Sequence, residues 1–112
     1  MKKSTSFVLV GALAFAGASL YGQGKMAAGD AAKGKGVFGD QCSVCHNSDS
    51  AEAKIGPGLK GLFKKAKLTS GTAVSDASVR AKLDAGGNGM PAYKDTLSAA
   101  EKSDVIAYLK TL

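Results

Sequence analysis

One five-residue motif constrains this chain more than any other feature, and it reads Cys42-Ser43-Val44-Cys45-His46. The spacing C-x-x-C-H is typical of covalent haem attachment. The two thiols add to the two vinyl groups on one edge of a porphyrin, and a short piece of helical chain brings both sulfurs to that edge. The next residue then projects over the ring plane. Because His46 is the only histidine in the chain, we expect its imidazole to bind the iron.

The same three residues allow other interpretations, and each of these lacks a part. A redox-active dithiol expects a strand-to-helix context, which the residues around the motif do not indicate. A tetrahedral zinc site needs four ligands, and Cys42, Cys45 and His46 have no fourth thiol or imidazole. A disulfide between the two cysteines would close too short a loop to stabilise much. We therefore expect one covalently attached haem c with its iron.

A second axial ligand follows by elimination. Haem iron takes methionine, histidine or an exchangeable ligand on its far side, and the single histidine is already used. Met1 belongs to the N-terminal leader, and Met26 lies in a short polar arm. Met90 follows a glycine-rich stretch, which lets backbone run close to a flat ring, and precedes a proline. We expect His46 and Met90 to hold the iron, with an ordinary core or loop methionine as the alternative.

The N-terminus has the three parts of a secretory signal peptide. Met1-Lys2-Lys3 is basic, residues 7–20 are almost entirely apolar or small, and small polar residues follow. The apolar run is short for a membrane span. We expect residues 1–22 to be the signal peptide, residues 23–29 a flexible arm, and residues 30–112 one exported, periplasmic domain. The alternative is an uncleaved segment that anchors the domain to the membrane.

Helical signals recur along residues 30–112, and no alternating run of β-branched residues predicts a sheet. Three helices are predicted from side chains that can cap an N-terminus, and a further stretch has apolar residues at helical spacing. The predicted caps are Asp30 for a helix over residues 31–38, Ser75 or Asp76 for a helix that ends at Gly86-Gly87, and Ser98 with Glu101 for the last helix. The further stretch contains Leu59, Leu62 and Phe63. The last helix also carries an apolar stripe, which consists of Val105, Ile106, Leu109 and Leu112.

Beyond the motif, most of the mature chain resembles a class I cytochrome c of the small bacterial monohaem type. Gly34 and Phe38 resemble the family's N-terminal helix, in which a glycine lets the C-terminal helix cross closely. The stretch from Val105 to Leu109 resembles that partner helix, with Tyr108 as the aromatic residue at the crossing. The resemblance implies an all-α fold, in which three to four short helices pack around one covalently bound haem and the terminal helices cross.

The resemblance extends to two loops. Gly56-Pro57-Gly58 resembles the loop whose proline carbonyl accepts a hydrogen bond from the proximal histidine, so Pro57 would fix the tautomer of that imidazole. Gly89-Met90-Pro91 resembles the distal methionine loop. One departure is that many relatives bind a haem propionate through tryptophan, and this chain has none. The resemblance leaves Arg80, Tyr93 or backbone amides as candidates for that role.

These residues favour electron transfer over catalysis. Two protein ligands close the coordination sphere of the iron, and a thioether ligand favours the ferrous state. The chain also has no second histidine and no phosphate-binding glycine motif. We therefore expect a soluble, monomeric electron shuttle that is not an enzyme. Two alternatives remain open: a haem-based sensor or small-ligand-binding domain in which Met90 is displaceable, and a fixed cytochrome subunit of a larger oxidoreductase.

Charge indicates the kind of partner. The formal net charge of the chain is +6. It falls to +4 when the signal peptide is removed with Lys2 and Lys3, because all acidic residues lie further along the chain. After that cleavage we expect no stable membrane insertion. A mildly basic protein is steered towards acidic partners. Dispersed lysines without interleaved aromatic residues argue against nucleic acid. We expect protein redox partners that dock on a lysine-rich surface; the alternative is that these lysines only form a solvated face. The predicted docking patch is Lys54, Lys60, Lys64, Lys65 and Lys67, with Lys94 a further candidate.

Overall fold

The computed structural model describes residues 28–112, and this part of the chain is helical with no β-strand. Within it, two isolated bridges pair Lys67 with Ala73 and Gly87 with Met90. The predicted all-α class is confirmed. The predicted signal peptide, residues 1–22, and Met26 lie outside the described residues. The helices are α1 (Ala31–Gln41), the 3-10 helix η1 (Leu62–Lys64), α2 (Asp76–Ala85) and α3 (Ala99–Leu109).

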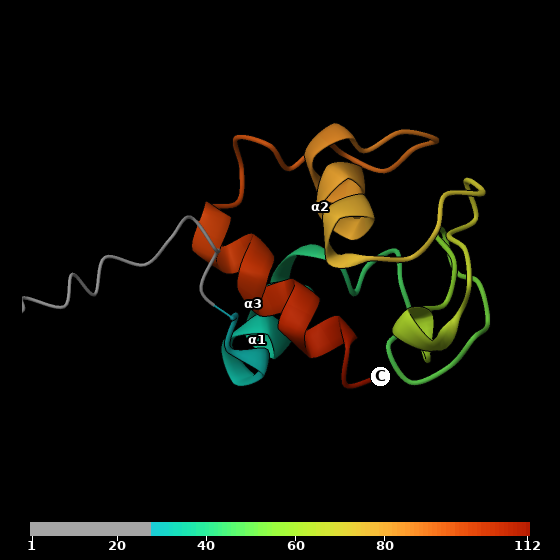
Figure 1. The fold of residues 1–112 in the computed structure, drawn as a ribbon, viewed down its shortest axis with the longest axis horizontal. Coiled ribbons are helices and arrows are strands. Elements are labelled where there is room, and N and C mark those ends of the chain that lie inside the picture. The colour runs from blue at the N-terminus through green and yellow to red at the C-terminus, as the bar shows by residue number, and fades with distance from the viewer. Residues whose placement is uncertain (1–27) are drawn as a thin grey trace, which may run out of the picture.

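The helices form two levels with a long loop region beside them (Figure 1). α3 crosses α1, and this is the most extensive contact between helices; α2 contacts α3. The connection between α1 and α2 carries η1 and forms the right-hand side of the molecule in Figure 1. Among residues 28–112, no helix combines the length and the apolar character that a membrane crossing requires.

The crossing of α1 and α3 depends on a glycine. Gly34 is buried, and a Cβ at this position would overlap the backbone carbonyl of Asp104 and approach the Cβ of Tyr108 to 2.9 Å. One turn further on, the rings of Phe38 and Tyr108 lie 5.5 Å apart at a tilt of 59°. The Asp104 carboxylate accepts a 2.7 Å hydrogen bond from the backbone N–H of Asp30. The two helices therefore meet backbone against backbone, and their crossing is held by an aromatic pair and a hydrogen bond.

The predicted helix starts are those that the structure contains. The Asp30 carboxylate accepts hydrogen bonds from the N–H groups of Ala32 and Lys33 at the start of α1. At α3, the Ser98 hydroxyl accepts from the N–H of Glu101 at 3.1 Å, while the Glu101 carboxylate accepts from the N–H of Ser98 at 2.8 Å. Ser75 caps α2. These side chains satisfy N–H groups that have no partner inside the helix.

The structure differs from the sequence-based expectations at two helices. α1 continues past residue 38 to Gln41, because packing against α3 outweighs the weak helix propensity of its glycines. The apolar spacing from Leu59 to Phe63 does not produce an α-helix. Gly61 adopts a φ of 71°, in the left-handed region, which breaks the helical path, so that a single 3-10 turn begins at Leu62.

Most of the apolar core comes from the faces that the helical spacing predicted. Val105, Ile106 and Leu109 of α3 are 1–4% exposed, and Leu112 packs at the edge of the same cluster. The remaining buried members of the cluster come from the other helices and the end of α1: Phe38, Cys42, Leu62, Val79 and Leu83.

A buried lysine, which the sequence did not indicate, ties three segments together. Lys102 in α3 is 7% exposed. Its ammonium group lies 2.6 Å from a carboxylate oxygen of Asp84 in α2 and donates a 3.0 Å hydrogen bond to the carbonyl of Lys94. This ammonium group therefore joins α3 to the end of α2 and to the loop between them.

The crossing yields a prediction about two glycines of α1. Gly34→Ala places a methyl group against the Asp104 carbonyl, so we expect it to lower the free energy of unfolding by about 1–3 kcal/mol. Gly36→Ala is the matched control: a Cβ there meets nothing within 4 Å, and alanine is the better helix former by roughly 0.5–1 kcal/mol. Denaturant unfolding followed by circular dichroism measures both. Equal or inverted effects would contradict the close crossing.

Candidate functional site

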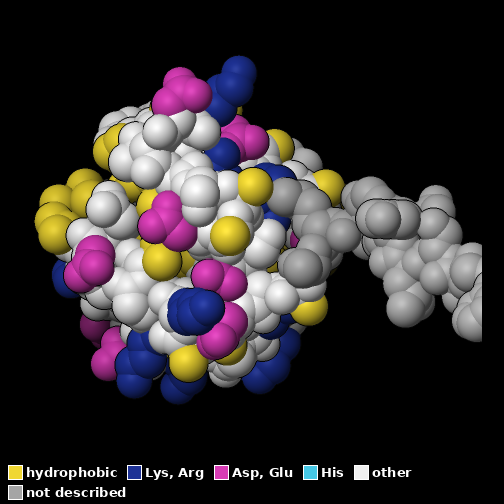
Figure 2. Space-filling model, turned by 90° about the vertical axis from the view of Figure 1, so that its left-hand side faces the viewer, with side chains coloured by type: hydrophobic (Ala, Val, Ile, Leu, Met, Phe, Trp, Pro, Cys, Tyr) yellow, Lys and Arg dark blue, Asp and Glu magenta, His cyan; other side chains and the backbone are white. Residues whose placement is uncertain are grey.

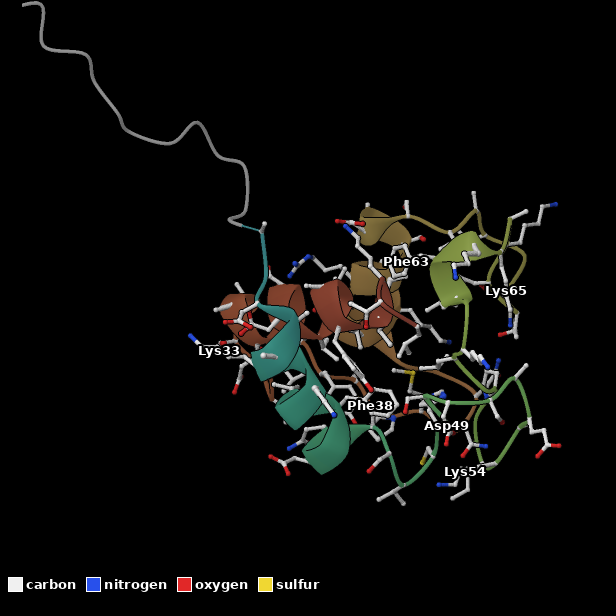
Figure 3. All side chains as sticks on the ribbon, turned by 90° about the horizontal axis from the view of Figure 1, so that it is seen from below. Lys33, Phe38, Asp49, Lys54, Phe63 and Lys65 are labelled. Atoms are coloured by element: carbon white, nitrogen blue, oxygen red, sulfur yellow. The ribbon has the colours of Figure 1, made fainter. Side chains whose placement is uncertain are left out.

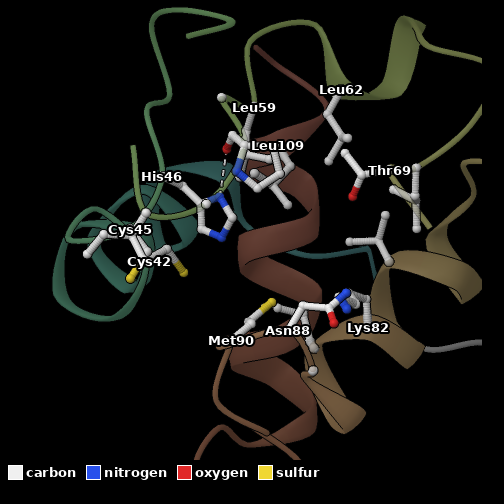
Figure 4. Close-up of a pocket in the computed structure, with 18 of the residues that line it drawn as sticks. Cys42, Cys45, His46, Leu59, Leu62, Thr69, Lys82, Asn88, Met90 and Leu109 are labelled. Atoms are coloured by element: carbon white, nitrogen blue, oxygen red, sulfur yellow. Dashed lines mark hydrogen bonds between the residues drawn. The ribbon is translucent and has the colours of Figure 1, made fainter. Parts of the chain in front are cut away.

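The C-x-x-C-H motif is the continuation of α1. Cys42 is the C-cap residue of that helix, and the N–H groups of Cys45 and His46 donate to its carbonyl at 3.1 and 2.9 Å. The chain therefore makes one more tight turn after the helix. Cys42 is buried, Cys45 is half-buried, and both are free thiols. Figure 4 shows their sulfurs beside the imidazole of His46 at one end of a cavity.

The cavity has a volume of about 430 Å³ and lies inside the apolar core. Side chains from α1, η1, α2 and α3 all contribute to its wall, which is mostly hydrophobic. The imidazole of His46 and the thioether of Met90 approach it from opposite sides (Figure 4). A nitrogen ligand, a sulfur ligand and two thiols thus surround a space that is otherwise suited to a flat apolar group.

The orientation of the His46 ring is set by the Pro57 loop. The Nδ1 atom of His46 lies 2.7 Å from the carbonyl oxygen of Pro57. Because a carbonyl oxygen only accepts, Nδ1 carries the proton, and Nε2 keeps its lone pair for a metal. Gly56 packs against the ring, since a Cβ there would lie 2.5 Å from Cε1 and 2.9 Å from Nδ1. The Gly56 N–H donates to the Cys45 carbonyl at 2.7 Å, which ties the loop to the motif.

Met90 is presented by a loop with an unusual backbone. Gly86, Gly87, Asn88 and Gly89 have φ values of 62°, 112°, 53° and 89°, and only glycine, with asparagine to a lesser degree, adopts this region readily. Gly87 and Met90 exchange two backbone hydrogen bonds of 3.0 and 3.1 Å. The glycine-rich sequence therefore forms a closed turn that ends with a half-buried methionine at the cavity.

Tyr93 connects this loop to the motif. Its N–H donates to the carbonyl of Leu83 at 2.7 Å, and its hydroxyl donates to the carbonyl of Gln41 at 2.9 Å. Gln41 directly precedes Cys42, so one tyrosine links the segment after Met90 with the residue before the first cysteine. The Met90 side of the cavity and the Cys42 side are therefore fixed relative to each other.

The state of the first thiol argues against a redox-active dithiol. Burial, with a further contribution from Cys45, raises the pKa of Cys42 to about 11. Reactive C-x-x-C sites need a lowered pKa, because the thiolate is the nucleophile. A thiol that stays protonated at neutral pH does not suit that chemistry. Within residues 28–112, no three His, Cys, Asp or Glu side chains gather as possible metal ligands.

Of the residues predicted to bind a propionate or to dock a partner, some line the cavity and others do not. Arg80, a candidate for binding a propionate, does not line it; its guanidinium donates to the Ser103 hydroxyl at 2.8 Å and links α2 to α3. Tyr93 lines the cavity, but its hydroxyl is bonded to Gln41. Within the predicted docking patch, Lys65 and Lys67 line the cavity, while Lys54, Lys60 and Lys64 do not.

Sequence reasoning missed Lys82, which also lines the cavity. A signal was available, because Lys82 lies three residues after Val79, and residues at that spacing are neighbours on the surface of a helix. Thr69, Ser70 and Asn88 also line the cavity. They belong to loops, for which sequence spacing predicts no common face.

Comparison with known proteins identifies the family. Residues 29–109 match the family model described as "Cytochrome C oxidase, cbb3-type, subunit III". Cytochrome c6 of a Nostoc species is 33% identical over 97% of this chain and 92% of that protein. Cytochrome c6 of a Synechocystis species is 31% identical over 73% of this chain, and the match spans 65% of that protein.

Two solved structures are also similar to this chain. Cytochrome c6 from the diatom Phaeodactylum tricornutum has a TM-score of 0.60 at 27% identity, over 74% of this chain and 93% of that one. Cytochrome cH from Methylobacterium extorquens has a TM-score of 0.54 at 28% identity, over 75% of this chain and the whole of that one.

The family implies one covalently bound haem c with its iron, and the cavity fits that group. Its apolar walls suit a porphyrin, two free thiols stand at one edge, and nitrogen and sulfur donors face each other across it. Motif, fold and comparisons agree with the resemblance noted in the sequence: the chain belongs to the class I cytochrome c family.

Proposed function

We propose that this protein is a periplasmic carrier of single electrons, with Cys42 and Cys45 attaching the haem and His46 and Met90 as its axial ligands. One observation carries the proposal: an imidazole and a thioether face each other across an apolar cavity that has two thiols at one edge (Figure 4). When bound, the haem supplies a one-electron couple between ferric and ferrous iron. The cytochromes c6 among the relatives are consistent with this role.

The chain's own residues prepare the ligands for this work. The Pro57 carbonyl fixes the tautomer of His46 and makes Nε2 a better donor. The backbone pairing of Gly87 with Met90 holds the methionine loop closed. Because these contacts fix the positions of both side chains in advance, the site needs little rearrangement between oxidation states. Little rearrangement favours fast electron transfer. The apolar wall limits access of water, which favours the ferrous state further.

The proposed compartment rests on the N-terminal sequence. A basic start, an apolar run and small polar residues predict a signal peptide over residues 1–22. Residues 23–29 would then be a short arm before the cytochrome domain at residues 30–112. The last arm residue, Gly29, lies against α3, where a Cβ would overlap the Ser103 carbonyl. In this proposal the protein is exported and acts as a monomer.

The proposed docking surface surrounds the mouth of the cavity. Val44 and Ile55 line the cavity, yet they are 69% and 77% exposed. Such exposed apolar side chains suit a transient protein contact. Lys65 and Lys67 border the same cavity and are exposed, and the Lys54 ammonium donates to the Ser43 carbonyl at 2.9 Å, next to Val44. Lys60 and Lys64 are the other exposed members of the proposed patch.

The end of the molecule at which α1 and α3 begin carries charges of both signs (Figure 2). Figure 2 shows the end at which α1 and α3 begin, where acidic and basic side chains are interspersed. In Figure 3, Lys54 and Lys65 lie on the loop side of the molecule, and Lys33 lies on the helical side. The proposed partner is therefore an acidic redox protein that docks on the loop side and not at the helix starts.

The first prediction tests ligation by Met90. We expect the oxidised protein to show a charge-transfer band from methionine sulfur to ferric iron, and Met90→Ala to abolish it, lower the midpoint potential and open the iron to rapid carbon monoxide binding. Met26→Ala is the matched control and should keep the band. If the unmutated protein lacks the band and binds carbon monoxide rapidly, a sensor or ligand-binding role replaces the carrier.

A second prediction concerns the packing behind the histidine. Gly56→Ala pushes a methyl group into the His46 ring, so we expect weaker iron ligation, seen as high-spin character in the ferric absorption spectrum, and a loss of about 1–3 kcal/mol in the free energy of unfolding. Gly39→Ala, where a Cβ meets nothing within 4 Å, is the control. An unchanged spectrum for Gly56→Ala would show that the ring does not depend on this contact.

The third prediction tests the lysines at the cavity mouth with small redox probes. We expect oxidation by anionic hexacyanoferrate(III) to slow with added salt, because ions screen the attraction to the lysines. The double variant Lys65→Gln/Lys67→Gln should react more slowly at low salt and show a flatter salt dependence. The control Lys33→Gln/Lys35→Gln removes the same charge from α1 and should change little. A salt response equal in both double variants would argue against a local patch.

A further inference from the structure

Three lysines contribute to the wall of the cavity. Lys65, Lys67 and Lys82 all contribute to the wall, and no Asp or Glu side chain of the described residues does. Thr69 and Asn88 add neutral hydrogen-bonding groups. In Figure 4, Thr69, Lys82 and Asn88 lie on the side away from the two cysteines. Three positive charges beside an otherwise apolar space call for an anionic occupant, and Lys82 is the one of the three that Figure 4 places at this end.

Lys82 is the best placed of the three lysines. It is half-buried, whereas Lys65 and Lys67 are exposed. Its position on α2 puts it on the face that also carries Val79 and Leu83, both of which line the cavity. Its ammonium group donates a 3.0 Å hydrogen bond to the Gly86 carbonyl. That bond holds the amine at the start of the methionine loop and leaves two further N–H donors.

No carboxylate of the described residues occupies these donors. The ion pairs in this part of the chain join Lys102 to Asp84 and Lys110 to Asp76. Lys82 is in neither pair. A half-buried ammonium at the wall of an apolar cavity is costly unless an anion compensates it.

Haem chemistry supplies such an anion. The two vinyl groups that become thioethers and the two propionates lie on opposite edges of the porphyrin. If Cys42 and Cys45 hold one edge, the propionates belong at the opposite end, which carries Lys82 (Figure 4). The chain has no tryptophan for them, and Arg80 is bonded to Ser103. Charge-assisted hydrogen bonds to carboxylates are stronger than bonds between neutral groups.

We propose that the end of the cavity away from the two cysteines (Figure 4) binds the haem propionates, with the Lys82 ammonium paired to one propionate and Asn88 and Thr69 as neutral partners. This assignment rests on the proposed attachment at Cys42 and Cys45. It gives Lys82 a second effect, because the same amine is bonded to Gly86 at the start of the loop that carries Met90. The cation would then both compensate the carboxylate and help to hold the methionine loop.

The pairing predicts a shift in midpoint potential. A positive charge near the iron disfavours the ferric state, and an uncompensated carboxylate favours it. In Lys82→Gln we therefore expect a lower midpoint potential, measured by redox titration of the purified haem protein. Lys82→Arg keeps the charge and should restore most of the potential. Lys35→Gln, an exposed lysine of α1, is the control for net charge and should leave the potential nearly unchanged. Lys65→Gln and Lys67→Gln should give smaller shifts than Lys82→Gln, because solvent screens exposed charges.

A spectroscopic readout separates pairing from general structural damage. The propionate bending mode in the resonance Raman spectrum responds to hydrogen bonding at the carboxylate, and we expect it to move in Lys82→Gln but not in Lys35→Gln. Lys82→Met retains a long apolar stem and provides the same comparison if the glutamine variant is poorly recovered. A methionine charge-transfer band that persists in these variants shows that ligation is intact.

The outcomes for the two proposals are distinct. A lowered potential with a moved Raman mode and a retained charge-transfer band supports the propionate assignment. An unchanged potential and an unmoved mode in both Lys82→Gln and Lys82→Met overturn it, while ligation by His46 and Met90 stands. Absence of the charge-transfer band from the unmutated protein overturns the proposed ligation, whatever Lys82 does.

Discussion

The close crossing of α1 and α3 is the contact on which the rest of the molecule depends. Gly34 brings the two backbones together, and the paired rings of Phe38 and Tyr108 fill the next turn. Because the motif continues α1 as one more turn, this crossing also sets where both thiols and the imidazole stand relative to the apolar stripe of α3. A shift in the crossing would move the proposed attachment points of the haem and the wall of the cavity together.

The core of this small domain is built around a space. Val79, Leu83, Val105 and Leu109 belong to one buried cluster and also line the cavity. A chain of this length buries a limited fraction of its surface by side-chain packing alone. The haem c that the family carries supplies the missing apolar contacts. Stability and function therefore share one interior.

The sequence predicted the local features well, since these depend on a few neighbouring residues. The Asp30 and Ser98 caps, the turn at Gly86 and the buried stripe of α3 follow from rules that act within one or two helical turns. The structure departs from the sequence-based expectations at two places, for reasons that hydrophobic spacing does not capture. Packing extended α1 to Gln41, and the left-handed backbone at Gly61 limited the next apolar pattern to a 3-10 turn. Arg80, a candidate for binding an anion, is instead bonded to Ser103 and does not line the cavity.

The C-x-x-C-H motif, the single histidine, the helical class and the family can all be read from composition and spacing along one chain. Which distant groups meet is settled by the packing of the folded chain. It brought the Pro57 carbonyl to Nδ1 of His46, buried Lys102 beside Asp84, and placed Lys82 at the end of the cavity away from the cysteines. Spacing rules cannot predict such meetings, because they depend on how loops and helices from separate parts of the chain close around a common space.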